Sequence, residues 1–275
     1  KGTSALTATV NDAATNWRIG SDEGATYGDL IGTTDEFKIY NYARSQKQIV
    51  EDMNGGHPAG GSPVGSQVGY WKFDEGQGIT ANNSGNGGSV LNGTLTSMAS
   101  PATSTSGWTN SGKFGKGLVF DGTNDYVDAG NTASLNFGTG NFSVSLWVKR
   151  GNTLSNDDLI GKYNSAASGE SGYNLYFLSN GVLYYYIVSD VNSGYSVTEF
   201  TDNNWHYVTL IRDGDNGYLY VDAVRESSAT NLSARVASST SNLKFGAGFI
   251  SQYFSGSLDE VKIYNYALTS DEVKL

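Results

Sequence analysis

The chain has 275 residues and carries 27 acidic against 17 basic side chains, which gives a formal net charge of -10 at pH 7. This charge, without any run of Lys and Arg, argues against a nucleic-acid partner, because phosphate binding needs a clustered basic face. Cysteine is absent, which removes disulfides and thiolate chemistry, and no apolar stretch approaches the roughly 18 to 20 residues that cross a bilayer.

The composition predicts strands rather than helices. The chain contains 36 Gly and 18 Tyr but only 16% charged residues, and helical surfaces are normally richer in Glu, Lys and Arg. No secretion-signal pattern begins at Lys1, so we expect any such signal to have been removed or to lie upstream in a longer parent protein. We therefore predict an all-β segment of an extracellular protein.

A repeated segment divides the chain. Eight of nine positions are identical between Asp35–Ala43 and Asp259–Ala267. We interpret residues 1–55 as the C-terminal part of a preceding repeat and residues 67–275 as a complete copy that ends at the same place. Residues 56–66 between them are rich in Gly, Pro and Ser, as is typical of a linker.

Each copy ends in a predicted helical turn with a capping box, Ser45 with Gln48 and Thr269 with Glu272. The partial copy contains only the last strands of a sandwich, and such strands are not stable alone. We expect residues 1–55 to add strands to an exposed sheet edge of the complete domain or of a neighbouring molecule.

Short runs and tight turns alternate through the complete copy at the spacing of a β-sandwich. Turns such as Asp121-Gly122 and Asn180-Gly181 supply the left-handed conformers that hairpins need. In Phe142–Val148 the even-numbered positions are apolar and should face the core. The predicted strands are Val68–Asp74, Gly117–Phe120, Tyr126–Asp128, Phe142–Lys149, Asp158–Lys162, Tyr173–Leu178, Val182–Val188, Trp205–Arg212, Gly217–Val221, Asn242–Phe245 and Ser257–Tyr264.

Six ordered segments resemble the laminin-G-like jelly roll of the concanavalin A-like lectin/glucanase superfamily, in its bacterial extracellular form. They are Tyr70–Gly78, Gly115–Gly122 with Asp125–Val127, Phe142–Lys149, Trp205–Arg212, Tyr218–Asp222 and Gly256–Leu268. The resemblance implies a two-sheet antiparallel jelly-roll sandwich, preceded by the C-terminal strands of a partial second copy. It does not select a function, because this fold serves lectins, carbohydrate-binding modules, adhesion domains, glucanases and lyases.

Four oxygen-bearing side chains are candidates for a structural calcium (Ca2+) site. Asp121, Asn124 and Asp125 follow a core strand within one turn, and calcium prefers carboxylate and amide oxygens. The resemblance implies that the ion lies between this turn and Asp259, where an acid at the edge of the core is costly unless it is paired or metal-bound. The alternative is an ordinary turn, with Asp259 bound to a backbone amide.

Aromatic side chains suggest a surface for sugar rings. In Leu183–Val188 the period of two sends Tyr184 and Tyr186 to the face opposite Leu183, so two tyrosines would stand together on an outer face. Further candidates for this surface or its loops are Tyr173, Tyr176, Tyr195 and Trp108. The alternative is that strand tyrosines cover the sheet without binding anything.

Catalytic patterns are missing from the sequence. A glycosidase on this fold needs two carboxylates on one face, whereas Asp74-Glu75 and Asp259-Glu260 are adjacent pairs that a strand sends to opposite faces. His206 has no partner at a recognisable spacing and is interpreted as a structural imidazole near a strand end. We therefore predict that the protein is not an enzyme.

These observations predict a non-catalytic carbohydrate-binding or adhesion module of a larger secreted or cell-surface protein. Its partner would be a polysaccharide or a cell-surface glycan, held by aromatic stacking and polar loop groups. The alternative is a structural or self-assembling adhesive repeat that contacts protein, namely another copy of itself or neighbouring repeats, through the incomplete N-terminal strands. An enzyme of lyase or glucanase type is the third possibility.

Overall fold

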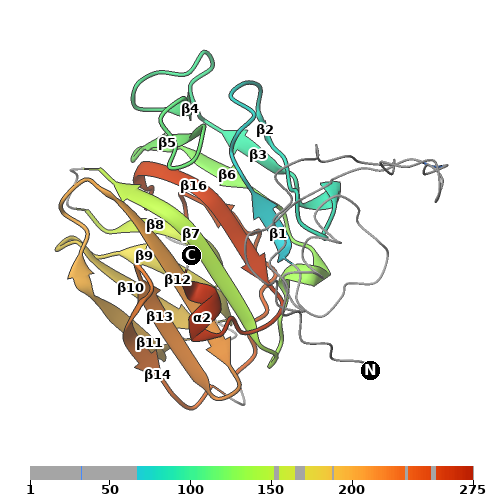
Figure 1. Ribbon diagram of the computed structural model, residues 1–275, viewed down its shortest axis with the longest axis vertical. Coiled ribbons are helices and arrows are strands. Elements are labelled where there is room, and N and C mark those ends of the chain that lie inside the picture. Colours follow the sequence, from blue (N-terminus) through green and yellow to red (C-terminus); the bar gives the residue numbers. More distant parts are fainter. Residues whose placement is uncertain are drawn as a thin grey trace, which may run out of the picture. The chain divides into compact units, whose positions relative to one another are not determined.

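The structure is a computed structural model, and it describes residues 32, 67–151, 155–164, 171–187, 189–232, 235–248 and 252–274. The predictions for residues 1–55, including the repeated strands, the first capping box and the self-assembling edge, lie outside the described residues. So does the linker at 56–66. The described part is an all-β sandwich of two antiparallel sheets (Figure 1), which confirms the predicted fold class.

The sheet nearer the viewer in Figure 1 is called the front sheet. Its strands follow the order β14-β13-β12-β7-β16-β5-β4, and β1 pairs with β16 outside this path. Their bounds are β1 Gln67–Trp71, β4 Gly107–Thr109, β5 Gly117–Asp121, β7 Phe142–Arg150, β12 Trp205–Asp213, β13 Asn216–Val221, β14 Val224–Ala229 and β16 Ser255–Tyr264.

The second layer is called the back sheet, with strand order β11-β10-β9-β8-β15-β6-β3-β2. Its bounds are β2 Thr80–Ala81, β3 Gly93–Thr96, β6 Tyr126–Asp128, β8 Asp157–Asn164, β9 Ser171–Phe177, β10 Val182–Ile187, β11 Ser189–Glu199 and β15 Lys244–Phe245. Two short 3-10 turns, η1 Ser89–Leu91 and η2 Ala133–Leu135, and one helix, α2 Ser270–Val273, complete the described elements.

The predicted strands are all present, most with shifted ends and β6 with the predicted bounds, but five others were not predicted. These are β2, β3, β4, β11 and β14. Most are short or polar, and β11 is a mainly polar strand at the edge of its sheet. The Glu226 carboxylate of β14 accepts hydrogen bonds from the backbone N–H groups of Val197 and Thr198 at 2.8 and 3.0 Å. A side chain from the other sheet therefore satisfies part of this edge, a contact that local patterning does not reveal.

The core fills the space between the two sheets. Phe142 and Leu146 on β7 are fully buried, as the alternation predicted, and so are Leu183 and Tyr185 on β10. Trp71 packs edge-on against Phe245 with ring centroids 4.8 Å apart. Its indole N–H donates to the carbonyl of Leu91 at 2.9 Å. Because Leu183 and Tyr185 face the core, the tyrosines at the even-numbered positions of β10 face away from it.

The C-terminal segment covers part of the outer face of the front sheet, where Figure 1 shows α2 in front of the strands. Leu268 and Val273 pack there with Ile211 and Tyr264 in a cluster separate from the main core. The predicted capping box is confirmed, because the Thr269 hydroxyl accepts from the Glu272 N–H while the Glu272 carboxylate accepts from the Thr269 N–H.

Candidate functional site

Five tyrosines cross the outer face of the back sheet, and we call them the tyrosine array. They come from four neighbouring strands: Tyr195 on β11, Tyr184 and Tyr186 on β10, Tyr176 on β9 and Tyr163 on β8. Ring centroids lie 4.7 Å apart for Tyr195 and Tyr184, 4.9 Å for Tyr184 and Tyr176, and 4.4 Å for Tyr186 and Tyr163. The predicted adjacency of Tyr184, Tyr186, Tyr176 and Tyr195 is therefore confirmed.

The rings of the array are not equally open. Tyr184 and Tyr186 are only 6% and 8% exposed, because neighbouring tyrosines pack edge-on against them. Tyr195 at the edge strand is 55% exposed. Among the described tyrosines of the array, Tyr195 therefore offers the ring surface on which a sugar could stack.

Two predicted ligand residues lie elsewhere, and the prediction that they join this surface is corrected. Tyr173 is 1% exposed and packs in the core at 5.0 Å from the Phe142 ring, because its position on β9 has the opposite parity to Tyr176. Trp108 is 9% exposed on the front-sheet strand β4, and its indole N–H donates to the carbonyl of Gly78 at 2.8 Å. Both side chains stabilise the sandwich.

Next to the array lies a buried polar pair, Asp158 on β8 and Asn174 on β9. Both residues are 2% exposed, and the Asn174 Nδ2 donates to Asp158 Oδ1 at 2.9 Å and to the Tyr186 hydroxyl oxygen at 3.3 Å. The Oδ2 of Asp158 and the Oδ1 of Asn174 have no hydrogen-bond partner among the described residues. Burial, with some repulsion from Asp157, raises the pKa of Asp158 to about 6 despite the hydrogen bond from Asn174.

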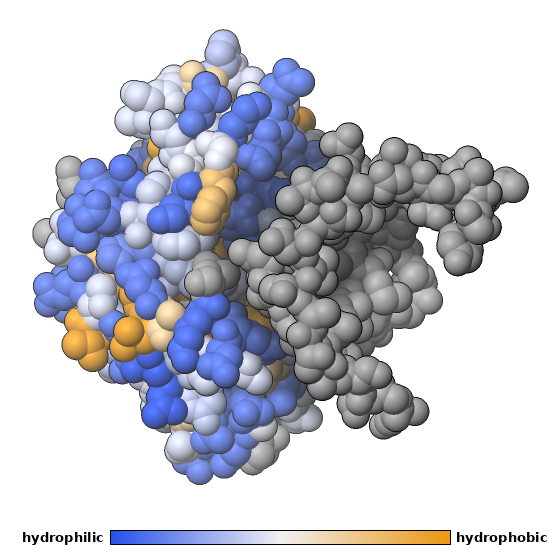
Figure 2. Space-filling model, viewed as in Figure 1, coloured by the Kyte–Doolittle hydropathy of each residue, from blue (hydrophilic) through white to orange (hydrophobic). Residues whose placement is uncertain are grey.

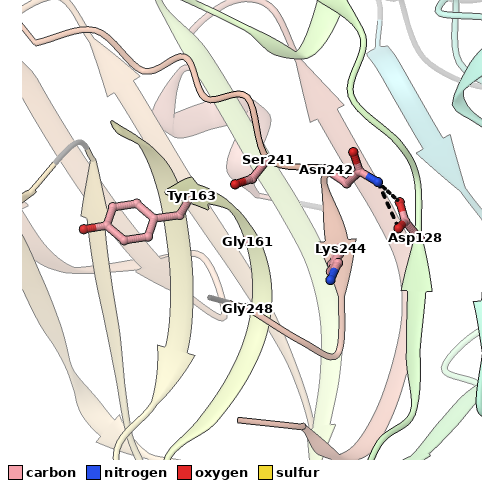
Figure 3. Close-up of a pocket in the computed structure, with 7 residues that line it drawn as sticks. All are labelled: Asp128, Gly161, Tyr163, Ser241, Asn242, Lys244 and Gly248. Carbon is pink, nitrogen blue, oxygen red and sulfur yellow. Dashed lines mark hydrogen bonds between the residues drawn. The ribbon is translucent and has the colours of Figure 1, made fainter. Parts of the chain in front are cut away.

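A cavity of about 270 Å³ opens on the same face, between Tyr163 on one side and Asp128 on the other (Figure 3). Gly161 and Gly248 form part of its wall, and a Cβ atom at either glycine would run into the Asn174 amide or the Asp158 carboxylate, respectively. The missing side chains thus let the polar pair lie directly behind the cavity wall. The full lining is Asp128, Gly161, Tyr163, Ser241, Asn242, Lys244 and Gly248.

Charged groups around the cavity are held by their own partners. Both oxygens of Asp128 accept from the Asn242 amide at 3.0 Å (Figure 3). The Lys244 ammonium lies 4.7 Å from the centre of the Tyr126 ring. Buried Lys162 donates to the Ser241 carbonyl at 2.9 Å, and burial lowers its pKa to about 8. Lys162 thereby fixes the loop that carries the Ser241 side of the cavity.

Three of the predicted calcium ligands share one turn, but Asp259 does not join them. Asp121 Oδ1 accepts from the N–H groups of Thr123 and Asn124 at 2.8 and 3.3 Å, which is an ordinary turn. The register of β16 with β5 pairs Ser255 with Asp121 and Leu258 with Leu118. Asp259 therefore lies at the opposite end of β5 from Asp121, and the described residues hold no group of three or more His, Asp or Glu side chains suited to a metal ion. Calcium binding itself stays a prediction.

Asp259 and Asp125 have protein partners instead. Asp259 is fully buried, and its carboxylate accepts from the N–H groups of Phe114 and Glu260, both at 2.8 Å. Burial raises its pKa to about 7, although these hydrogen bonds oppose the shift. Asp125 is also fully buried and accepts from the Asp121 N–H at 3.1 Å. The backbone-capping alternative for Asp259 is the one that the geometry supports.

His206 is a hydrogen-bonded imidazole at the start of β12, as predicted. Its Nδ1 lies 2.7 Å from Asp222 and its Nε2 lies 3.1 Å from Asp202. Burial alone would lower its pKa, but the two carboxylates outweigh burial and raise it. The sequence showed no partner at a recognisable spacing, and the structure supplies two carboxylates; Asp222 comes from the turn after β13, a proximity that strand pairing creates.

The fold is a two-sheet jelly-roll sandwich, an architecture that lectins, other binding domains and glucanases share. The family model described as the Concanavalin A-like lectin/glucanases superfamily, in its laminin-G form, matches residues 121–274. The chain belongs to this family, which confirms the resemblance found in its sequence. No curated protein matches the sequence.

Several solved structures share the fold. The binding domain of Paraclostridial Mosquitocidal Protein 1 has a TM-score of 0.57 at 19% identity, over 76% of this chain and 51% of that one. Domain 4 of AbnA, an extracellular GH43 arabinanase from Geobacillus stearothermophilus, was solved with arabinotriose. Its TM-score is 0.55 at 17% sequence identity, and the match covers 76% of this chain and 97% of that one. Trypanosoma rangeli sialidase has a TM-score of 0.57 at 14% sequence identity, and the match covers 78% of this chain and 32% of that one. The chain thus spans about half of the mosquitocidal binding domain, at 51%.

No helix within the described residues is long and apolar enough to cross a membrane.

Proposed function

We propose that this domain is a non-catalytic carbohydrate-binding module of a larger extracellular protein, and that it holds a polysaccharide or cell-surface glycan across the outer face of the back sheet. The observation that carries the proposal is the continuity of the tyrosine array with the polar cavity. Sugar recognition combines aromatic contact with convergent polar groups, and this face carries both.

The dimensions of this face suit a chain of sugars. The array and the cavity extend from β11 to β6, across the strand order β11-β10-β9-β8-β15-β6. At a spacing of about 4.8 Å between strands, this path is about 24 Å long, which accommodates several linked sugar units. Domain 4 of AbnA, which shares the fold, was solved with arabinotriose, so arabinan is a natural first probe.

The carboxylates on this face support a binding role rather than hydrolysis. A glycosidase needs two carboxyl groups free to act on one bond, one as acid and one as nucleophile or base. Both oxygens of Asp128 are held by Asn242, and Asp157 points to the other side of β8, where its carboxylate pairs with Arg150 at 3.2 Å. Among the described residues of this face, Asp158 therefore has no second free carboxylate with which to hydrolyse a glycosidic bond.

Affinity electrophoresis followed by titration calorimetry tests the proposal, with arabinan, xylan, galactan, mannan and β-glucan as probes. We expect at least one of these polysaccharides to bind. Tyr195→Ala should weaken that binding about tenfold, because it removes the exposed ring of the array. The matched control is Tyr220→Ala on the outer face of the front sheet, which should bind like the wild type. If no probe binds, or if both variants behave alike, the proposal fails.

A further inference from the structure

A second cavity, of about 510 Å³, lies at one end of the sandwich and is lined by loops. We call it the loop cavity, and the cavity lined by Gly161 and Lys244 the sheet cavity. Thr123, in the turn before β6, and Ser179, in the turn after β9, line the loop cavity with polar side chains. Tyr253, just before β16, adds an aromatic ring to this lining. Segments far apart in the sequence therefore meet at the loop cavity.

A buried arginine holds two walls of the loop cavity together. Arg150 is 2% exposed, and its Nη2 donates to the carbonyl of Ser155 at 2.8 Å and to that of Leu178 at 3.2 Å. The same nitrogen pairs with the Asp157 carboxylate at 3.2 Å. Ser155 and Asp157 line the cavity, and Leu178 directly precedes Ser179 on the opposite wall. The cavity is therefore formed by the fold itself, and a ligand would have little ordering of the protein to offset.

Two tyrosine rings connect the loop cavity with the sheet cavity. The ring centroids of Tyr253 and Tyr126 lie 6.4 Å apart, and the ring planes are inclined by 31°. Tyr126 lies two positions before Asp128 on β6, and Asp128 lines the sheet cavity. Because Val127 between them is buried in the core, both residues are on the outer face of the back sheet. Tyr126 and Tyr253 are half-buried, so an aromatic surface that reaches solvent leads from one cavity to the other.

The two cavities are displaced along the strands, whereas the tyrosine array crosses them. Both β6 and β8 pair antiparallel with β15, so β6 and β8 run in the same direction. Thr123 and Asn156, just before the two strands begin, line the loop cavity, and Asp128 and Gly161 further along line the sheet cavity. On β8, Asp157 and Gly161 line one cavity each and are about 13 Å apart along the strand. The sheet cavity is therefore a corner where two nearly perpendicular directions meet.

A lysine lies at this corner. Lys244 lines the sheet cavity on the side of Asp128 (Figure 3), and its ammonium lies 4.7 Å from the centre of the Tyr126 ring. Within the described part of the chain, this ammonium has no hydrogen-bond acceptor and no ion pair. An ammonium carries three N–H donors, so Lys244 can donate to oxygen atoms of a ligand that passes the corner.

We propose, resting on the proposed function, that this domain recognises a branched polysaccharide. The main chain lies across the tyrosine array and enters the sheet cavity, and a branch extends over Tyr126 and Tyr253 into the loop cavity. Lys244 donates to sugar oxygens where the branch leaves the main chain. A linear chain that follows the array does not reach the loop cavity without a right-angle turn. A branch therefore adds contacts within the same complex, which raises the affinity.

The test is calorimetry with branched and linear forms of whichever polysaccharide the wild type binds most tightly. The pairs are arabinan and debranched arabinan, arabinoxylan and xylan, arabinogalactan and galactan, galactomannan and mannan, and a β-1,3-glucan with and without β-1,6 branches. We expect the branched form to bind about tenfold more tightly. Tyr253→Ala should remove most of this preference, whereas Tyr195→Ala should weaken both forms equally. Tyr220→Ala, on the outer face of the front sheet, is the matched control and should keep both wild-type affinities.

Further measurements separate the possible failures. Thermal unfolding shows whether each variant is folded, and Gln252→Ala, at a polar side chain of the loop cavity, is a second variant that should reduce the preference about threefold. If the wild type binds the linear form as tightly as the branched one, or if the folded loop-cavity variants keep the full preference, this inference is overturned while the proposed function survives. If the wild type binds none of the polysaccharides, both fail together.

Discussion

The outer faces of the two sheets differ in how their polar and aromatic groups are satisfied. On the front sheet, the Lys113 ammonium lies 4.0 Å above the Trp147 ring, and Glu260 accepts from the Tyr70 hydroxyl at 2.5 Å and pairs with Lys262 at 3.2 Å. Seen from this side, the surface is mostly hydrophilic with small separate apolar spots (Figure 2). On the back sheet, Asp158 and Asn174 each keep a buried oxygen without a partner in the described structure.

The contacts on the front face stabilise the fold, whereas the buried Asp158 carboxylate on the back face reduces its stability. The C-terminal segment packs over part of the front face. The buried hydroxyls of Ser145 and Thr209 there also lack a hydrogen-bond partner among the described residues, so the difference between the faces lies in the Asp158 carboxylate. The back face retains an unpaired carboxylate that an apolar or amide side chain would replace at a gain in stability. Sites for ligands commonly carry such a cost, so the comparison favours the back face as the functional one.

The largest expected effect is on the back face, where Asp158→Asn should stabilise the protein at high pH. The folded state holds the Asp158 proton up to about pH 6, whereas the unfolded chain releases it near 3.8. The contribution of Asp158 to wild-type stability should therefore fall as the pH rises between these values, by on the order of 3 kcal/mol, and stay low above them, a change that Asp158→Asn removes. Urea unfolding at about pH 4 and pH 8 measures this. A variant less stable than wild type at the higher pH would contradict the account.

A smaller effect of opposite sign is expected on the front face, from Leu268→Ala. Leu268 is 8% exposed and belongs to the cluster that holds the C-terminal segment on the sheet. Losing these contacts should lower the free energy of unfolding by about 2 kcal/mol and leave polysaccharide binding unchanged. Val224→Ala, at a 62% exposed position of the same sheet, is the control. Loss of binding in the Leu268 variant would show that the two faces are not independent.

The smallest effect is expected at the cap of the same segment. Thr269→Ala removes the hydroxyl that accepts from the Glu272 N–H, and loss of such a cap costs about 1 kcal/mol. Thermal unfolding should show a melting temperature a few degrees lower. Lys274→Ala should leave it unchanged, because its pair with Asp271 is exposed and contributes little. Equal effects of the two substitutions would indicate that the capping box does not hold α2.

The candidate site was only partly predictable from the sequence. Alternation along β10 correctly separated Tyr184 and Tyr186 from Leu183 and Tyr185, because successive side chains of a strand point to opposite faces. The same rule shows why Tyr173 and Tyr176 could not both lie on the surface. Asp158 and Asn174 were not singled out, although a polar residue at an outward position of an otherwise apolar strand is a usable signal.

Calcium binding stays a prediction, but Asp259 lies apart from the other three predicted ligands for a different reason. The residue types at Asp121, Asn124, Asp125 and Asp259 suit the ion, but proximity depends on the register of β16 against β5. That register is set by long-range pairing and by the bulge between Asp259 and Lys262 in the pairing of β16 with β7. Composition and local spacing carry no information about it.

By itself, the sequence determined the all-β class, the family and the sides of β7 and β10 that face the core, because these follow from composition, ordered motifs and a local period of two. Only the tertiary structure decided which outward side chains meet. The sheet order places β15 between β8 and β6, which brings Lys244 and Asp128 to the cavity beside Tyr163. Contacts between residues far apart in the sequence depend on the free energy of forming the whole sandwich, which local sequence patterns do not show.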